Sequence, residues 1–183
     1  MNSFLLIWSL CKRDYAIQFA GSILGLFWVV IQSVVLISLY LMIFWVLDIH
    51  PTSKASSISY IITGILFWLP IQEFLNRGTV ILTENRQLIK KTGLGVNIFL
   101  KVPLFQMYLH FLILSIPCYI VLYFLGSLNL SFFFVSFIWY IILGLILYPI
   151  ISYLGRANVI LKDISPVIRL FLQVLFWGSP LLY

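Results

Sequence analysis

Few side chains in this sequence could carry out acid–base, metal-assisted or nucleophilic chemistry, and they are scattered. The chain has 5 Asp and Glu residues and 2 His residues among its 183 residues. No apolar segment contains a pair of carboxylates, and no His or Cys residues recur at metal-ligand spacing. Cys11 and Cys118 fall in separate segments and indicate no disulfide framework. We therefore expect no catalytic residue and no metal site.

Two residues are the strongest individual candidates for proton chemistry. Glu73 falls near the end of an apolar segment, four residues before Arg77, where the two could pair on one helix face. His110 is alone within a later apolar segment, where a packing role is the simpler interpretation. Nucleotide binding by a Walker loop is not expected either, because the glycine pair Gly93 and Gly95 lacks the rest of that motif. We expect no cofactor in this chain.

The composition indicates an integral membrane protein. Hydrophobic residues make up 63% of the chain and charged residues 9%, with a mean hydropathy of +1.13, outside the range of a domain with a polar surface. The net charge of +6 comes from short basic islands between apolar runs. Membrane topology explains these islands, and we expect no nucleic-acid binding.

The apolar runs predict an all-α fold, a polytopic transmembrane helical bundle over residues 22–183. We expect spans at about 22–47, 58–75, 102–125 and 132–154, and a segment at 170–183 that is incomplete or re-entrant. Of the 11 Lys and Arg residues, only Lys54 lies outside in this layout, so the basic islands and the N-terminus are cytoplasmic. Residues 1–21 predict an amphipathic helix in the cytoplasmic interface, or alternatively a frayed terminus.

The longest polar stretch, residues 76–101, is expected to be the cytoplasmic loop between the second and third spans. Within it, apolar and basic residues alternate as in an amphipathic helix over residues 84–91. This surface could contact an acidic partner protein or, alternatively, anionic lipid. The residues expected to make the contact are Glu84, Asn85, Arg86, Leu88, Lys90 and Lys91.

Several motifs stand out in order along the chain: Arg13 with Tyr15; Gly21-Ser22-Ile23-Leu24-Gly25 with Trp28; Gly64, Trp68, Phe74 and Gly78; Asn85-x-x-Leu88-Ile89-Lys90-Lys91; Lys162-Asp163-Ile164; and Trp177-x-Ser179-Pro180-Leu181-Leu182-Tyr183. In their order and spacing, these motifs resemble the permease subunits of ABC exporters for polysaccharides. The resemblance covers nearly the whole chain and departs from the family at Ser33, Gly93-Leu94 and Lys162, which leaves the exported polymer open. The family continues beyond its Ser-Pro-x-x-Tyr motif, so the chain is expected to be truncated or partly represented.

The resemblance implies a transport subunit rather than an enzyme. It implies a homodimer in a bacterial or archaeal plasma membrane, joined by two ATP-binding cassette ATPase subunits that carry ATP and magnesium, and a lipid-linked polysaccharide such as O-antigen, capsule or teichoic acid as substrate. Residues 84–91 would then couple to the ATPase. By the same resemblance, an aromatic translocation path would be lined by Phe67, Trp68, Trp177 and Tyr183.

Gly21 and Gly25 form a small-x-x-x-small pair that predicts close helix packing, either in the dimer or within one subunit. Two other functions remain open for the chain as a whole. One is a permease for a smaller lipid or a drug, and the other is a membrane-embedded glycan-modifying enzyme such as an acyltransferase. A neighbouring reading frame for a Walker-motif ATPase would separate exporter from enzyme.

Overall fold

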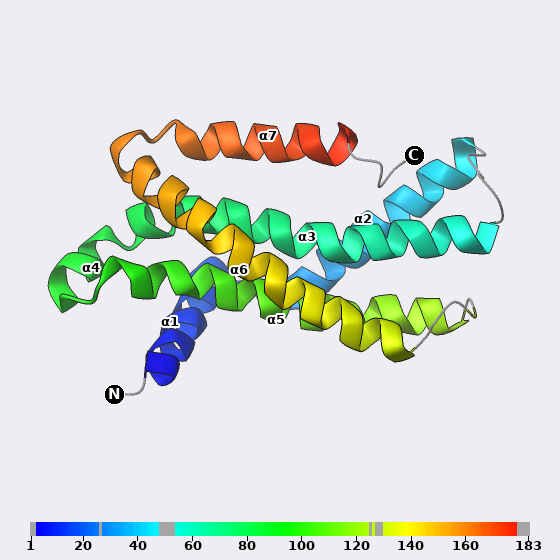
Figure 1. Cartoon of the computed structure of the whole chain (residues 1–183), viewed down its shortest axis with the longest axis horizontal. Coiled ribbons are helices and arrows are strands. Elements are labelled where there is room, and N and C mark those ends of the chain that lie inside the picture. The colour runs from blue at the N-terminus through cyan, green and yellow to red at the C-terminus, as the bar shows by residue number, and fades with distance from the viewer. Residues whose placement is uncertain (1–2, 26, 48–53, 125, 127–129, 179–183) are drawn as a thin grey trace.

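A computed structural model describes residues 3–25, 27–47, 54–124, 126 and 130–178. Within these ranges the chain forms helices and no strands, which confirms the predicted all-α class there. Figure 1 shows the helices in their spatial arrangement. In chain order they are α1 (Ser3–Gln18), α2 (Phe27–Leu47), α3 (Lys54–Glu84), α4 (Arg86–Thr92), α5 (Val96–Phe124), α6 (Leu130–Ile160) and α7 (Ile164–Gly178).

The core forms between three long helices. Helices α3 and α5 run side by side in opposite directions, and α6 crosses both (Figure 1). The buried core side chains come from all three, because each helix presents an apolar stripe to the others. Aromatic stacking fixes the centre, where the rings of Phe111 and Tyr140 are 4.1 Å apart. The main cluster comprises Ile62, Leu66, Phe74, Met107, Phe111, Leu114, Cys118, Leu122, Tyr140 and Ile151.

Two glycines allow α6 to approach α3 closely. A Cβ atom added at Gly155 would lie 2.7 Å from the backbone oxygen of Gly78, and one added at Gly78 would overlap Ile151. Near this crossing, Nδ2 of Asn158 donates a hydrogen bond of 2.9 Å to the carbonyl oxygen of Thr79. Small residues at the contact and a buried amide beside it hold the two helices together.

Helix α4 is a short turn of helix between the ends of α3 and α5. The chain leaves the helical conformation at Asn85, and Gly93 ends α4 in the left-handed conformation with φ 62, which glycine adopts without steric cost. Residues 76–101, expected as a loop, thus consist mainly of the end of α3, all of α4 and the beginning of α5.

Two stretches are long and apolar enough to cross a membrane, namely Val96–Phe124 and Phe133–Ile160, when only the described residues are considered. At 1.5 Å per residue both exceed the roughly 30 Å of a bilayer's hydrocarbon layer. Helix α3 continues past the expected end of the second span to Glu84, and α7 begins before residue 170. Helix α1 is steeply inclined to α3 and α5 (Figure 1), and its Leu10, Cys11 and Tyr15 are buried.

Candidate functional site

A buried carboxylate joins α1 to two of the three core helices, α3 and α5. Asp14 is 4% exposed and accepts hydrogen bonds from Nη2 of Arg77 in α3 at 2.6 Å and from Nε2 of Gln106 in α5 at 2.8 Å. Arg77 also pairs with the exposed Glu84 at 2.9 Å. A buried charge is tolerated when it is paired and hydrogen-bonded. We call Asp14, Arg77, Gln106 and Glu84 the Asp14 cluster.

The neighbouring residue of α1 contacts the start of α4. Nη2 of Arg13 donates a hydrogen bond to Oδ1 of Asn85, the residue directly before α4. The side-chain nitrogen Nδ2 of Asn85 donates a hydrogen bond of 2.9 Å to the carbonyl oxygen of Ile81. Both the oxygen and the nitrogen of the Asn85 side-chain amide therefore have a partner, and Arg13 connects α1 to the start of α4.

The six residues expected to contact a partner divide into two groups. Arg86, Lys90 and Lys91 are exposed, and the two lysines fall in the last turn of α4. Asn85 is buried at 8% exposure, and Leu88 is half-buried against the apolar cluster under α1. Glu84 is exposed but engaged with Arg77. The outward surface of α4 is thus basic, while Asn85 and Leu88 hold it in place.

A groove of about 300 Å³ lies beside this basic surface. Its floor is apolar, from Leu82, Ile89, Val96 and Val159, and its rim carries Arg86, Lys90 and Arg156. Arg156 is held by a 2.7 Å hydrogen bond from its Nη2 to Oδ1 of Asn97. An apolar floor with a cationic rim suits an apolar side chain flanked by acidic residues.

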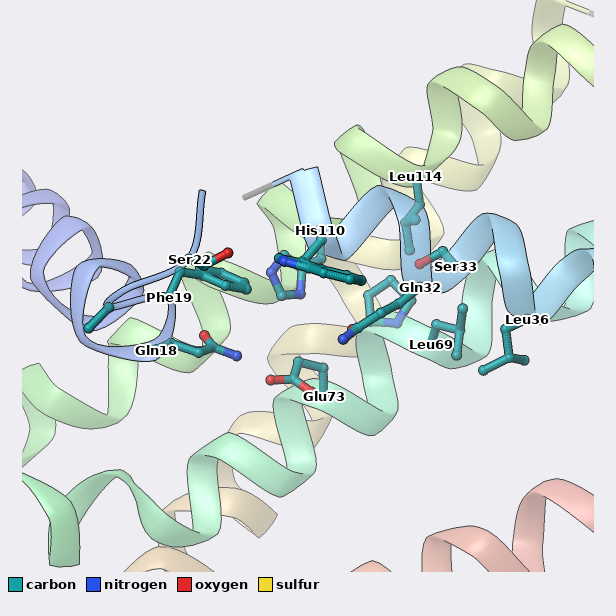
Figure 2. Close-up of a pocket in the computed structure, with 13 residues that line it drawn as sticks. Gln18, Phe19, Ser22, Gln32, Ser33, Leu36, Leu69, Glu73, His110 and Leu114 are labelled. Atoms are coloured by element: carbon teal, nitrogen blue, oxygen red, sulfur yellow. The ribbon is translucent and has the colours of Figure 1, made fainter. Parts of the chain in front are cut away.

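A larger pocket, which we call the central pocket, has a volume of about 580 Å³. It opens where the linker after α1 meets α2, α3 and α5 (Figure 2). Its polar lining comes from four parts of the chain: Gln18, Ser22, Gln32, Ser33, Glu73 and His110. The sequence marks Gln32, Ser33, Glu73 and His110 as polar residues in apolar segments, but their spacing along the chain does not indicate that they meet.

His110 is the most deeply buried of the candidate acid–base groups in the pocket. It is 5% exposed, and its Nε2 atom has no hydrogen-bond partner within the described part of the chain. Its ring packs against Tyr15 at 5.7 Å. Glu73 accepts a hydrogen bond from Gln18, whereas Arg77, its expected partner, pairs with Asp14 and Glu84. The pocket thus retains unused hydrogen-bonding capacity.

Three of the aromatic residues expected along a translocation path, Phe67, Trp68 and Trp177, are described, and none of them lines this pocket. Phe67 packs against Phe111 and Tyr140 at 5.6 and 5.7 Å. Trp68 donates a hydrogen bond of 3.0 Å to Gln72 and packs against Phe176. Trp177 is 54% exposed on α7. Tyr183 lies outside the described residues. Within one copy of the chain, Phe67 and Trp68 are packing residues.

The glycine pair expected at a helix contact lies in the linker between α1 and α2. Gly21 and Gly25 have φ of 80 and 49, and a Cβ atom at either position would meet nothing within 4 Å. Neither residue belongs to a helix, so the two glycines form no helix contact within this chain, and their expected role in a dimer stays a prediction. Positive φ explains the glycines, because other residues reach it only with strain.

In the described part of the chain, no group of three His, Cys, Asp or Glu side chains is arranged so that it could hold a metal ion. Cys11 belongs to α1 and is buried. This burial, with a smaller contribution from Asp14, raises the pKa of the Cys11 thiol to about 12. The thiol is therefore protonated at neutral pH and is a poor nucleophile.

The chain matches no model of a known protein family and no curated protein.

Proposed function

We propose that this chain is the membrane-spanning permease subunit of an ATP-driven exporter of lipid-linked polysaccharide, acting as a homodimer with two separate ATPase subunits. One observation carries the proposal. A short basic helix, α4, connects the end of α3 to the start of α5. It is joined to α1 by the hydrogen bond between Arg13 and Asn85. A partner that pushes on α4 would therefore move the elements around the central pocket.

The surface of the helices supports a multi-pass membrane protein. On α6, the side chains of Ile138, Trp139, Leu145 and Ile146 are each more than half exposed. Monomeric soluble proteins rarely expose apolar patches of that extent. Helix α2 adds 21 residues without a charged side chain. Lipid would cover these surfaces at lower free-energy cost than water.

The positions of the basic residues support a cytoplasmic location for one end of the helical bundle, the end that carries α4. Helix α4 and the connection between α6 and α7 lie at the same end of the long helices (Figure 1). Lys90, Lys91 and Lys162 belong to these segments, whereas Lys54 begins α3 at the other end. Cations gather on the cytoplasmic side of membrane proteins. Helix α1, inclined to the bundle at the basic end, suits an interface helix with a cytoplasmic N-terminus.

The ATPase partner is inferred from the chemistry of α4. Its exposed Arg86 and Lys90 border the groove with the apolar floor, so the complementary surface is an acidic cleft with an apolar centre. Electrostatic complementarity of this kind determines orientation and association rate. The polysaccharide substrate is inferred from the family resemblance of the motifs around Arg13, Asn85 and Trp177.

The path for a polymer would lie between two copies of the chain. Phe67 and Trp68 are occupied in packing, whereas the outward face of α7 carries Phe171, Val174 and Trp177, each more than half exposed. An aromatic and aliphatic face can slide along sugar rings without holding any one ring. A second copy facing α7 would complete that path.

The test uses the chain expressed together with an ATP-binding cassette ATPase subunit from the same genome. Lys90→Glu with Lys91→Glu should lower co-purification of the ATPase and stimulated ATP turnover by about tenfold, with loss of surface polysaccharide. Lys101→Glu, an exposed lysine on α5, is the matched control and should leave all three unchanged. Normal coupling in the double variant at normal membrane levels would refute the role of α4. Export of a small lipid without polysaccharide would refute the substrate.

A further inference from the structure

The central pocket has a polar end and an apolar end. Figure 2 shows Gln18, Glu73 and His110 around the same space, with Leu36 and Leu69 toward the other end, where Ser33 is the polar exception. Leu114 adds a further apolar side chain to that end. The volume of about 580 Å³ is within the roughly 300–1,000 Å³ of small-molecule sites. The shape and the polarity gradient match one amphiphilic molecule, with its head at Gln18 and its chain along the leucines.

The charge of the lining restricts the head group. Among the described residues that line the pocket there is one carboxylate, Glu73, and no Lys or Arg. Sites for phosphate normally supply Arg, Lys or a helix N-terminus. A phosphate head would instead face the Glu73 carboxylate without a compensating cation in the lining. The pocket therefore disfavours anionic heads.

The hydrogen-bonding groups favour hydroxyls. Gln18 and Gln32 each carry a donor and an acceptor, and the imidazole of His110 presents the unpartnered and buried Nε2 atom. A buried polar atom without a partner costs free energy, which a ligand hydroxyl would recover. Phe19 and Trp28 supply aromatic surface beside these groups, suited to the C–H face of a sugar ring.

We propose that the central pocket binds a non-ionic amphiphile whose hydroxyl-rich, sugar-type head contacts Gln18, Gln32, Glu73 and His110 and whose apolar chain lies along Leu36, Leu69 and Leu114. The site belongs to a single copy of the chain and is separate from the path between two copies. Its occupant would contact the linker after α1. That linker directly follows the helix that carries Arg13 and Asp14. Binding at this site does not require that the chain be an exporter.

The experiment uses the full chain in lipid nanodiscs and dodecyl glucoside with a diazirine at the end of its chain. Illumination should label residues near Leu36, Leu69 and Leu114, identified by mass spectrometry. Three unlabelled competitors share the dodecyl chain and differ in the head: glucoside, phosphate and trimethylammonium. The glucoside should displace the label at concentrations at least tenfold below either charged amphiphile.

Variants separate the pocket from the lipid-facing surface. Gln32→Leu should weaken glucoside binding by roughly three- to tenfold, the effect of losing one or two hydrogen bonds. Gln173→Leu, at an exposed glutamine of α7, is the control and should have no effect. Leu36→Trp fills the apolar end and should abolish labelling in the pocket, with folding checked by gel filtration.

Three results would overturn the proposal. One is labelling of the exposed face of α6 as strongly as of the pocket, which would mean nonspecific contact with lipid-like molecules. Another is stronger competition by dodecyl phosphate or by the ammonium compound, which would assign the site to a charged head. The last is labelling of the folded Leu36→Trp and Gln32→Leu variants at the level of the unaltered chain.

Discussion

Nη2 of Arg77 in α3 lies 2.6 Å from Oδ1 of Asp14 in α1, although the two residues are 63 positions apart in the chain. Both side chains are largely withdrawn from solvent, at 17% and 5% exposure. This ion pair is the principal electrostatic link between the N-terminal helix and the bundle. Arg77 has a second partner, Glu84, which is exposed to solvent. The buried pair with Asp14 should therefore contribute more to the stability of the fold than the exposed pair with Glu84.

Removing the buried partner should cost far more than removing the exposed one. Arg77→Gln leaves the Asp14 carboxylate buried without its cation, and we expect a loss of about 3–5 kcal/mol. Glu84→Gln removes the exposed partner of the same guanidinium and should cost less than about 1 kcal/mol. Unfolding in detergent, followed by circular dichroism, measures both. Equal losses would show that Asp14 is solvated in the folded protein.

The contact between Arg13 and Asn85 should be needed for coupling. Arg13→Ala removes the hydrogen bond from α1 to the start of α4. The ATPase partner should still bind, because Lys90 and Lys91 are unchanged. Its stimulated ATP turnover should fall several-fold, because α4 is no longer joined to α1. Lys12→Ala changes the adjacent, exposed cation and should have little effect. Full stimulation in Arg13→Ala would show that α4 acts on the bundle without α1.

A single methyl group at the crossing of α3 and α6 should destabilise the bundle. In Gly155→Ala the new Cβ would meet the backbone oxygen of Gly78 at 2.7 Å, and backbone cannot move aside cheaply. We expect a loss of about 1–3 kcal/mol, typical of overpacking. Gly178→Ala, where nothing lies within 4 Å, is the control. Thermal unfolding of the two variants should differ by several degrees, and identical curves would exclude the close crossing.

Replacing the aromatic residues of the expected path by Ala should change the free energy of unfolding by different amounts, depending on how deeply each ring is packed. Phe67 packs within the core cluster, so Phe67→Ala should lower the free energy of unfolding by about 2–3 kcal/mol, somewhat below the range for a fully buried ring. Trp177, at 54% exposure, should change it by less than about 1 kcal/mol when replaced by Ala. Loss of export in Trp177→Ala with ATP turnover intact would support a path role for that residue.

Cys11 should resist alkylation near neutral pH. Because burial raises its pKa to about 12, only about one thiol in ten thousand is ionised at pH 8, and thiolate is the reactive form. The raised pKa means that labelling should increase as the pH rises toward 12. Ser9→Cys, exposed on the same helix, provides a reactive reference. Comparable labelling of both cysteines at pH 8 by mass spectrometry would refute the burial of Cys11.

Some features of the site follow from the pattern of the sequence and others do not. The run from Glu84 to Lys91 has helical periodicity, and the structure contains α4 at Arg86–Thr92. The same pattern could not show that Asn85 faces inward, because that orientation depends on Arg13, which approaches from α1. Nor could it distinguish Gly21 and Gly25 on a helix from the linker glycines observed, since spacing alone does not report φ.

By itself, the sequence determined the helical class of the described residues, the apolar character of the long segments and the basic nature of the segment around α4. These properties are local, because they depend on which residue types recur along a few turns of chain. Only the tertiary structure decided that Arg77 pairs with Asp14 rather than with Glu73, that Gly78 meets Gly155, and that Gln18, Gln32, Glu73 and His110 surround one pocket. Each of these contacts joins different elements, and its free energy depends on burial and distance that arise only when the helices pack.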